Sequence, residues 1–169
     1  YSSAASDVYK RQVKGRKETV TVTADEGIRP GTTAEGLAKL RPAFVKDGTI
    51  TAASASQISD GAAAVVLTTR ENAETKGLEI LATLGEYGQT AGPDTKLHSQ
   101  PSQATAAALQ KAGWEAGDLD FLEINEAFAS VVAQSIKDLD YPLDKTNIHG
   151  GGISLGHPIG ASGARLVLS

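Results

Sequence analysis

The run Ala62–Thr69, with the sequence AAAVVLTT, sets the strongest limit on the fold of this chain. Its residues are small, apolar or β-branched, and the turn residues Ser59, Asp60 and Gly61 precede it. A run of this kind without polar alternation is typical of a strand that is buried on both faces. Such a strand needs helices on both sides of its sheet, so the sequence predicts a layered α/β fold.

Other segments also have the patterns of strands or of helices. Apolar and β-branched patterns predict further strands at residues 17–23, 78–87 and 121–124. Helices are predicted at residues 34–40, 70–76, 102–112, 127–139 and 161–168, with Ser102 and Ser162 expected to cap two of them and Gly113 to end one.

Composition excludes several classes of protein. The 169 residues contain 16 Lys and Arg against 20 Asp and Glu, and no basic stripe that would bind nucleic acid. No stretch approaches the roughly 18 apolar residues that a membrane span needs. The chain has no Cys, and its three His are scattered, so neither a thiol nucleophile nor a metal site is expected within it.

His157 lies in the segment HGGGISLGHPIGASGAR, residues 149–165, which is unusually rich in glycine. Glycines let the backbone turn tightly and approach a ligand closely. An imidazole on such a loop can accept or donate a proton, or polarise a substrate oxygen. The alternative is a tight turn in which His157 only binds backbone groups, and composition alone favours this alternative.

Asn125 stands where the predicted strand 121–124 meets the following helix. Ligands of helix-covered sheets commonly bind at the carboxyl ends of strands, where the Asn125 amide could orient a water or a substrate oxygen. The alternative is that Asn125 simply caps the helix, as asparagine often does.

Taken together, these segments resemble the thiolase family. NEAFA, which contains Asn125, is followed about thirty residues later by GGGISLGHPIGASGAR, and both are similar to C-terminal signatures of that family. KLRPAF and SDGAAAVVL resemble its middle section. The resemblance implies part of a layered α-β-α-β-α fold. Residues 13–56 would end the coenzyme A-binding loop domain and residues 57–169 would form a truncated C-terminal domain, whereas residues 1–12 are interpreted as a non-native leader.

The resemblance also implies roles for particular residues. His157 would activate a nucleophilic cysteine and help to form an oxyanion hole, Asn125 would hold a water in a donor pair, and Phe128 would line the pocket. Coenzyme A or acyl contacts would come from Arg29, Leu40, Phe44, Ala52, Ser56 and Leu97. Without the resemblance, Phe44 is more simply a core residue, Arg29 a solvated charge and Ser56 a turn residue.

Thiolases transfer acyl groups between acyl-CoA and coenzyme A, by acetyl-CoA condensation or 3-ketoacyl-CoA thiolysis, through a cysteine thioester. Because this chain has no Cys, we expect a fragment that is inactive alone, with both family cysteines outside it. No cofactor is expected, since coenzyme A is a substrate. The resemblance further implies a homodimer or homotetramer, and a cytoplasmic location if the source is bacterial.

Two other classes remain open. A non-catalytic thiolase-like protein could bind acyl-CoA or lipid, although it would not need His157 and Asn125 together. A 3-ketoacyl synthase shares the architecture, but its usual second histidine motif is not seen.

Overall fold

The computed structural model describes residues 11–14, 19–25 and 27–169, which fall into two compact units divided between Lys39 and Leu40. In the first unit, β1 (Arg11–Lys14) pairs antiparallel with β2 (Thr19–Val22). β2 confirms the described part of the strand predicted at 17–23. β1 includes two residues of the segment interpreted as a leader, whose first ten residues lie outside the described part.

Helix α1 (Ala34–Leu37) is shorter than the predicted helix 34–40. The Thr33 side chain caps it by accepting a hydrogen bond from the Gly36 amide at 3.1 Å. The helix stops before the Arg41-Pro42 pair.

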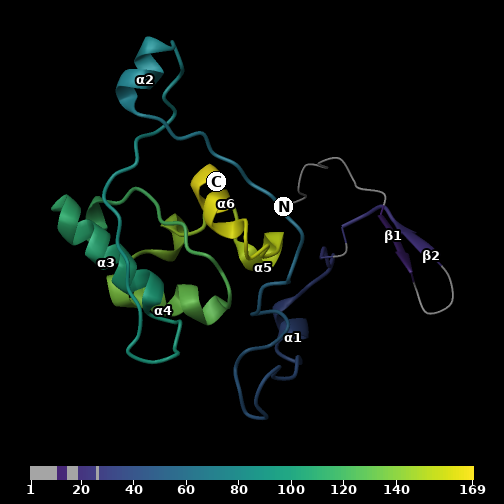
Figure 1. Cartoon of the computed structure of the whole chain (residues 1–169). Helices are drawn as coiled ribbons and strands as arrows, with labels where there is room; N and C mark the ends of the chain where they lie inside the picture. The colour runs from purple at the N-terminus through teal and green to yellow at the C-terminus, as the bar shows by residue number, and fades with distance from the viewer. Residues whose placement is uncertain (1–10, 15–18, 26) are drawn as a thin grey trace. The chain divides into compact units, whose positions relative to one another are not determined.

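The second unit contains the remaining helices, which Figure 1 labels: α2 (Arg70–Thr75), α3 (Gln100–Ala112), α4 (Ala129–Leu139), α5 (Gly152–Leu155) and α6 (Ser162–Leu168). Two 3₁₀ turns occur at Ala116–Asp118 and Leu143–Lys145. Helices α3 and α4 pack against each other. Gly113 ends α3 at a φ of 71°, as predicted, because glycine adopts this left-handed conformation without steric cost.

A small core lies beneath α4. Ile124, Val131 and Val132 are buried, and Leu122, Phe128 and Ile136 pack against them. The apolar face predicted for residues 127–139 is therefore confirmed, although the helix itself begins at Ala129.

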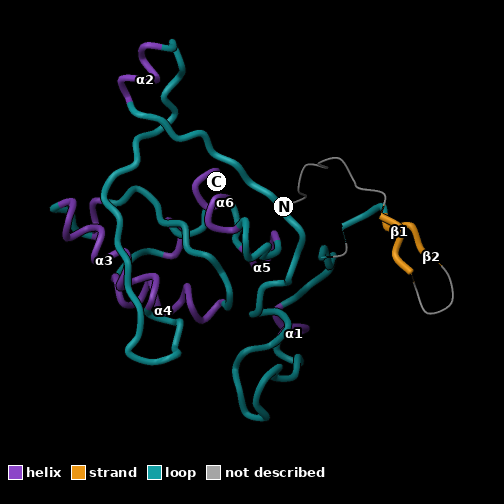
Figure 2. The backbone as a smooth tube through the Cα atoms, in the orientation of Figure 1, coloured by secondary structure: helices purple, strands orange, loops and turns teal. Residues whose placement is uncertain are grey.

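The predicted strands at 62–69 and 78–87 are wrong for this structure. Both segments are drawn as loop in Figure 2, and within the described residues neither pairs with another strand. Val66 is 91% exposed and Leu81 87% exposed. A strand is stabilised by hydrogen bonds to a neighbouring strand, so an apolar sequence alone does not produce one.

The strand predicted at 121–124 is reduced to one parallel bridge between Leu122 and Thr146. The Leu122 amide donates to the Lys145 carbonyl, and the Asn147 amide donates to the Leu122 carbonyl, both at 2.9 Å. This bridge places Asn125 beside the glycine-rich segment.

Two predicted helix caps are also wrong. Ser102 lies inside α3, where its hydroxyl donates to the Ser99 carbonyl and to Asp138, and Ser99 is the residue that precedes the helix. Ala161 precedes α6, and Ser162 is its first residue. Neither serine stands at the position before its helix, where a side chain can accept from the free amides of the first turn, so neither caps it.

Candidate active site

The two motifs are joined by residues 54–58, which we call the connecting segment. On one side, the Ala129 amide donates to the Ser54 carbonyl at 2.8 Å, and the Ser56 amide donates to the Ala127 carbonyl at 3.2 Å. On the other side, the His157 amide donates to the Gln57 carbonyl at 2.8 Å. Backbone hydrogen bonds therefore fix the start of α4 and the histidine loop to the same short piece of chain.

This arrangement brings Asn125 and His157 into contact. Asn125 Nδ2 lies 3.2 Å from His157 Nε2, and both side chains are half-buried. Asn125 does not cap α4, since Phe128 precedes that helix and no side chain caps it. The alternative of simple capping is therefore wrong.

The other ring nitrogen of His157 faces Ser162, with Nδ1 2.7 Å from Oγ. The Ser162 hydroxyl donates to the Pro158 carbonyl at 3.1 Å, so its oxygen is free to accept a hydrogen from Nδ1. The Asn125 amide nitrogen can only donate, and Nε2 must accept from it. Both partners thus favour the neutral tautomer that carries its proton on Nδ1.

Asn125 Oδ1 is buried and accepts no hydrogen bond from the described residues. A buried amide oxygen without a partner is costly, so it is suited to accept a hydrogen from a water or from a ligand. The pair therefore offers a basic ring nitrogen, an amide N–H and a free acceptor within one short span.

Sequence reasoning missed two residues here, Glu126 and Asn147. The Glu126 carboxylate accepts hydrogen bonds from Asn147 Nδ2 and from the Ile153 amide, each at 2.9 Å. The only sequence signal was position, because Glu126 directly follows Asn125 and Asn147 precedes the glycines.

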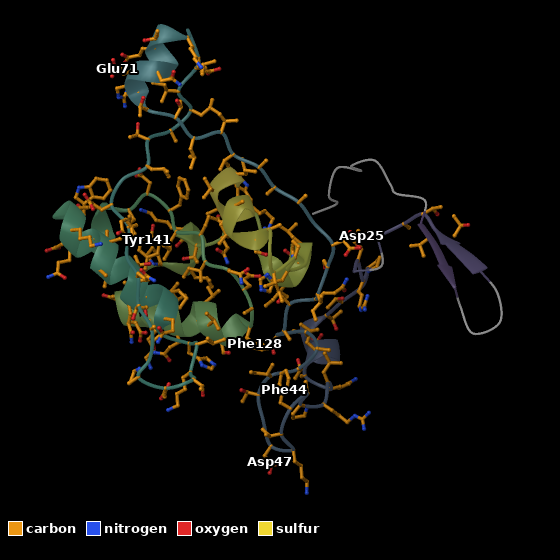
Figure 3. The ribbon with its side chains drawn as sticks, in the orientation of Figure 1. Asp25, Phe44, Asp47, Glu71, Phe128 and Tyr141 are labelled. Atoms are coloured by element: carbon orange, nitrogen blue, oxygen red, sulfur yellow. The ribbon has the colours of Figure 1, made fainter. Side chains whose placement is uncertain are left out.

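Some of the predicted coenzyme A contacts gather near this pair. The rings of Phe44 and Phe128 meet edge to face, with their centroids 5.9 Å apart. Both residues are labelled in Figure 3. The Ser56 hydroxyl donates to the Ala127 carbonyl at 3.2 Å. A Cβ placed on Gly152 would lie 3.6 Å both from Ser56 Cβ and from Asn125 Oδ1, so these two side chains flank the same glycine.

The other predicted contact residues are placed less closely. Ala52 is exposed in a turn next to the Thr51–Ser54 hydrogen bonds, and Leu40 is 40% exposed. Leu97 is 54% exposed just before α3. Arg29 belongs to the first compact unit. The structure does not bring Leu40, Ala52 or Leu97 to His157, and the roles of all four residues stay predictions.

Two residues outside the pair have shifted pKa values. Hydrogen bonds from Ser99, Ser102 and Gln134 lower the pKa of the Asp138 carboxyl, and burial raises the pKa of Tyr141. Neither touches His157. Among the described residues, no group of His, Asp and Glu could hold a metal ion.

Two family models match the chain. The model described as "Thiolase, N-terminal domain" matches residues 3–71, and "Thiolase, C-terminal domain" matches residues 78–169, more than half of the sequence. The chain belongs to the thiolase family. Two expectations about this thiolase chain stay predictions: the non-native leader at residues 1–12 and the domain boundary after residue 56.

Named thiolases are close relatives. Human peroxisomal 3-ketoacyl-CoA thiolase is 52% identical over 156 residues, which are 92% of this chain and 37% of the relative. A probable acetyl-CoA acetyltransferase of Mycolicibacterium smegmatis is 52% identical over 165 residues, 97% of this chain and 42% of the relative. The chain thus spans about two fifths of the relatives that it matches.

Solved structures of thiolases are similar to the structure of this chain. The acetyl-CoA acetyltransferase of Bacillus anthracis has a TM-score of 0.81 at 42% identity, covering 93% of this chain and 40% of that chain. The dimeric peroxisomal thiolase of Saccharomyces cerevisiae has a TM-score of 0.81 at 40% identity, with the same coverage. The prediction that this chain forms part of a thiolase-like α/β fold is confirmed. No described helix is long and apolar enough to cross a membrane.

Proposed function

We propose that this chain supplies the histidine and asparagine of a thiolase active site within a longer acyltransferase. That enzyme would transfer acyl groups between acyl-CoA and coenzyme A. The observation that carries the proposal is the 3.2 Å contact between Asn125 Nδ2 and His157 Nε2, held in place by the connecting segment.

In this proposal, the nucleophile is a cysteine outside the chain, since the chain has none. When the Asn125 amide no longer donates to His157 Nε2, this nitrogen accepts the proton of the cysteine thiol. The resulting thiolate attacks the thioester carbonyl carbon. The imidazolium then has an N–H on Nε2 that can stabilise the oxyanion. The oxyanion collapses, the bond from the carbonyl carbon to the sulfur of coenzyme A breaks, and that sulfur takes the proton from His157 Nε2 and leaves as a thiol, while the acyl group stays on the cysteine.

Asn125 has a complementary role in the next step, in which the acyl-enzyme condenses with a second acyl-CoA. Its free Oδ1 would accept a hydrogen from a water whose other hydrogen points at the thioester oxygen of the second acyl-CoA. Negative charge gathers on that oxygen when the second family cysteine, which also lies outside this chain, takes a proton from the acyl carbon. Stabilising this charge lowers the barrier to carbon–carbon bond formation in condensation and to its reverse in thiolysis.

We assign substrate binding by the same reasoning. Phe44 and Phe128 offer an aromatic wall to the pantetheine arm, with Ser56 beside it, and the positive charge of Arg29 suits a phosphate of coenzyme A. Leu40, Ala52 and Leu97 would complete the coenzyme A and acyl contacts. Coenzyme A is then a substrate and no other cofactor is needed. The longer enzyme would be a homodimer or homotetramer, and cytoplasmic in a bacterium.

Sequencing the gene outward from both ends is the first test. We expect a cysteine in a small-residue setting upstream and a Cys-Gly pair downstream. The encoded enzyme should then cleave acetoacetyl-CoA with coenzyme A, and the variant His157→Ala should lose at least about 100-fold in kcat, the usual scale for removing a general base.

His149→Ala is the matched control, because His149 is exposed in the same glycine-rich segment. It should keep its activity. Near-normal thiolysis by His157→Ala would contradict the assigned role. Binding of coenzyme A with no turnover by the complete enzyme would instead favour a non-catalytic thiolase-like protein.

A further inference from the structure

Glu126 makes an unusual pair of contacts for a residue next to the proposed active site. One carboxylate oxygen, Oε1, accepts from Asn147 Nδ2, and the other, Oε2, accepts from the Ile153 amide, each at 2.9 Å. The backbone of Gly151 lies close to the same group, since a Cβ built there would be 2.5 Å from Oε2. The carboxylate is thus enclosed by the glycine-rich segment.

Asn147 extends these contacts back to the start of the motif. Its Oδ1 accepts from the Ile124 amide at 2.7 Å, and its Nδ2 donates to the Ile124 carbonyl at 3.0 Å. Asn147 has a φ of 49°, a conformation that asparagine tolerates better than most residues. Its side chain therefore binds the backbone of the residue that precedes Asn125.

The link to His157 runs through α5. Ile153 lies in this single helical turn, in which the Leu155 and Gly156 amides donate to the Gly151 and Gly152 carbonyls at 2.9 and 3.0 Å. His157 is the next residue. Holding the Ile153 amide therefore limits how far the imidazole can move from the backbone that carries Asn125.

We infer that Glu126 is a positioning residue, which sets the distance between Asn125 and His157 by holding both segments with one carboxylate. The consequence for acyl transfer rests on the function proposed above. Glu126 itself does not touch the reacting atoms, because both of its oxygens already accept hydrogen bonds from the protein.

The chemistry of the two partners explains why a carboxylate is needed. Asn147 Nδ2 and the Ile153 amide are both donors, so the residue between them must accept twice. Glutamine has one acceptor and one donor, and would place a donor against a donor. Aspartate is one methylene shorter and could not reach both partners from the same backbone position.

Nitrogen NMR of the chain with ¹⁵N-labelled histidine tests this inference without any need for turnover. The chain has only three His, and His157→Gln identifies the His157 signals. The wild-type spectrum should show His157 with its proton on Nδ1. In Glu126→Gln the contact with Asn125 should loosen, and the ratio of the two neutral tautomers should fall about tenfold, the scale of one hydrogen bond to a charged acceptor.

Glu79→Gln is the matched control, because Glu79 is exposed in a loop. The His98 signal reports the fold, since the His98 carbonyl accepts a hydrogen bond from the buried Ser135. Asn147→Asp provides a second variant, which places two carboxylates together and should change His157 in the same direction.

Three outcomes would overturn the inference. One is an unchanged His157 tautomer ratio in folded Glu126→Gln. Another is an equal change in Glu79→Gln. The third is loss of the His98 signal in both Glu126→Gln and Asn147→Asp, which would make Glu126 a general support of the fold. In the longer enzyme, Glu126→Gln should lower kcat about tenfold with little change in KM. Absence of all acyl transfer there would refute the proposed function and leave the NMR result standing.

Discussion

Replacing Ser162 with alanine tests whether the protein selects the tautomer of His157. Ser162 is 2% exposed, and its oxygen lies 2.7 Å from Nδ1. The substitution removes only this hydroxyl. The Pro158 carbonyl keeps two other donors, the Ala161 amide at 2.8 Å and the amide of residue 162 at 2.9 Å. The Nδ1 hydrogen is therefore the one group that loses its partner.

The size of the effect follows from that single loss. Leaving a buried donor without an acceptor costs about 1–3 kcal/mol, which corresponds to a factor of about 5 to 150 in an equilibrium constant. The ring can avoid this cost by moving its proton to Nε2, where the Asn125 amide then opposes it. We therefore expect the ratio of the Nδ1 tautomer to the Nε2 tautomer to decrease by a factor within that range.

Histidine ¹⁵N shifts measure the ratio directly, with Ser154→Ala as the control. Ser154 is exposed in α5, and its hydroxyl donates to the Gly151 carbonyl at 3.1 Å without touching His157. A tautomer ratio in Ser162→Ala within about twofold of the wild type, below the lower limit of that range, would refute the reasoning.

Three further predictions concern stability. Gly88→Ala should destabilise the chain by about 1–3 kcal/mol or more in urea unfolding, because its Cβ would overlap the Ala104 carbonyl of α3 and lie 2.8 Å from the Ala108 amide. Tyr141→Phe should cost about 0.5–1.5 kcal/mol at pH 7, since the Tyr141 hydroxyl donates to the Leu119 carbonyl at 3.0 Å. Because burial raises the pKa of Tyr141, the wild type should lose this advantage as the pH rises above about 10, and an advantage that persisted there would contradict this. Hydrogen bonds from Ser99, Ser102 and Gln134 lower the pKa of Asp138, so its stabilisation over Asp138→Asn should be present above pH about 4 and shrink below it; equal acid sensitivity of the two proteins would be the contrary result.

The sequence predicted those features that depend on local pattern. The apolar face of 127–139 identified α4, and Gly113 ended α3 as expected, because both depend on neighbours within a few residues. The motifs around Asn125 and His157 identified the pair that the structure brings together.

Features that depend on distant partners were not predictable in this way. The run at 62–69 has the composition of a buried strand, yet Val66 is exposed because no neighbouring strand lies beside it in the described structure. Ser162 looks like a helix cap in the sequence, but its hydroxyl oxygen lies within hydrogen-bond distance of His157 Nδ1. Glu126 needed a partner 21 residues away before its role was visible.

The connecting segment makes the Asn125–His157 contact a cooperative property. The amides of Ser56, Ala129 and His157 are all protected by hydrogen bonds that involve residues 54–58, so a local opening of this short piece releases all three together. Protection of these amides against solvent exchange should therefore rise and fall in unison. An alteration within residues 54–58 would then reach both motifs at once, although it changes neither Asn125 nor His157.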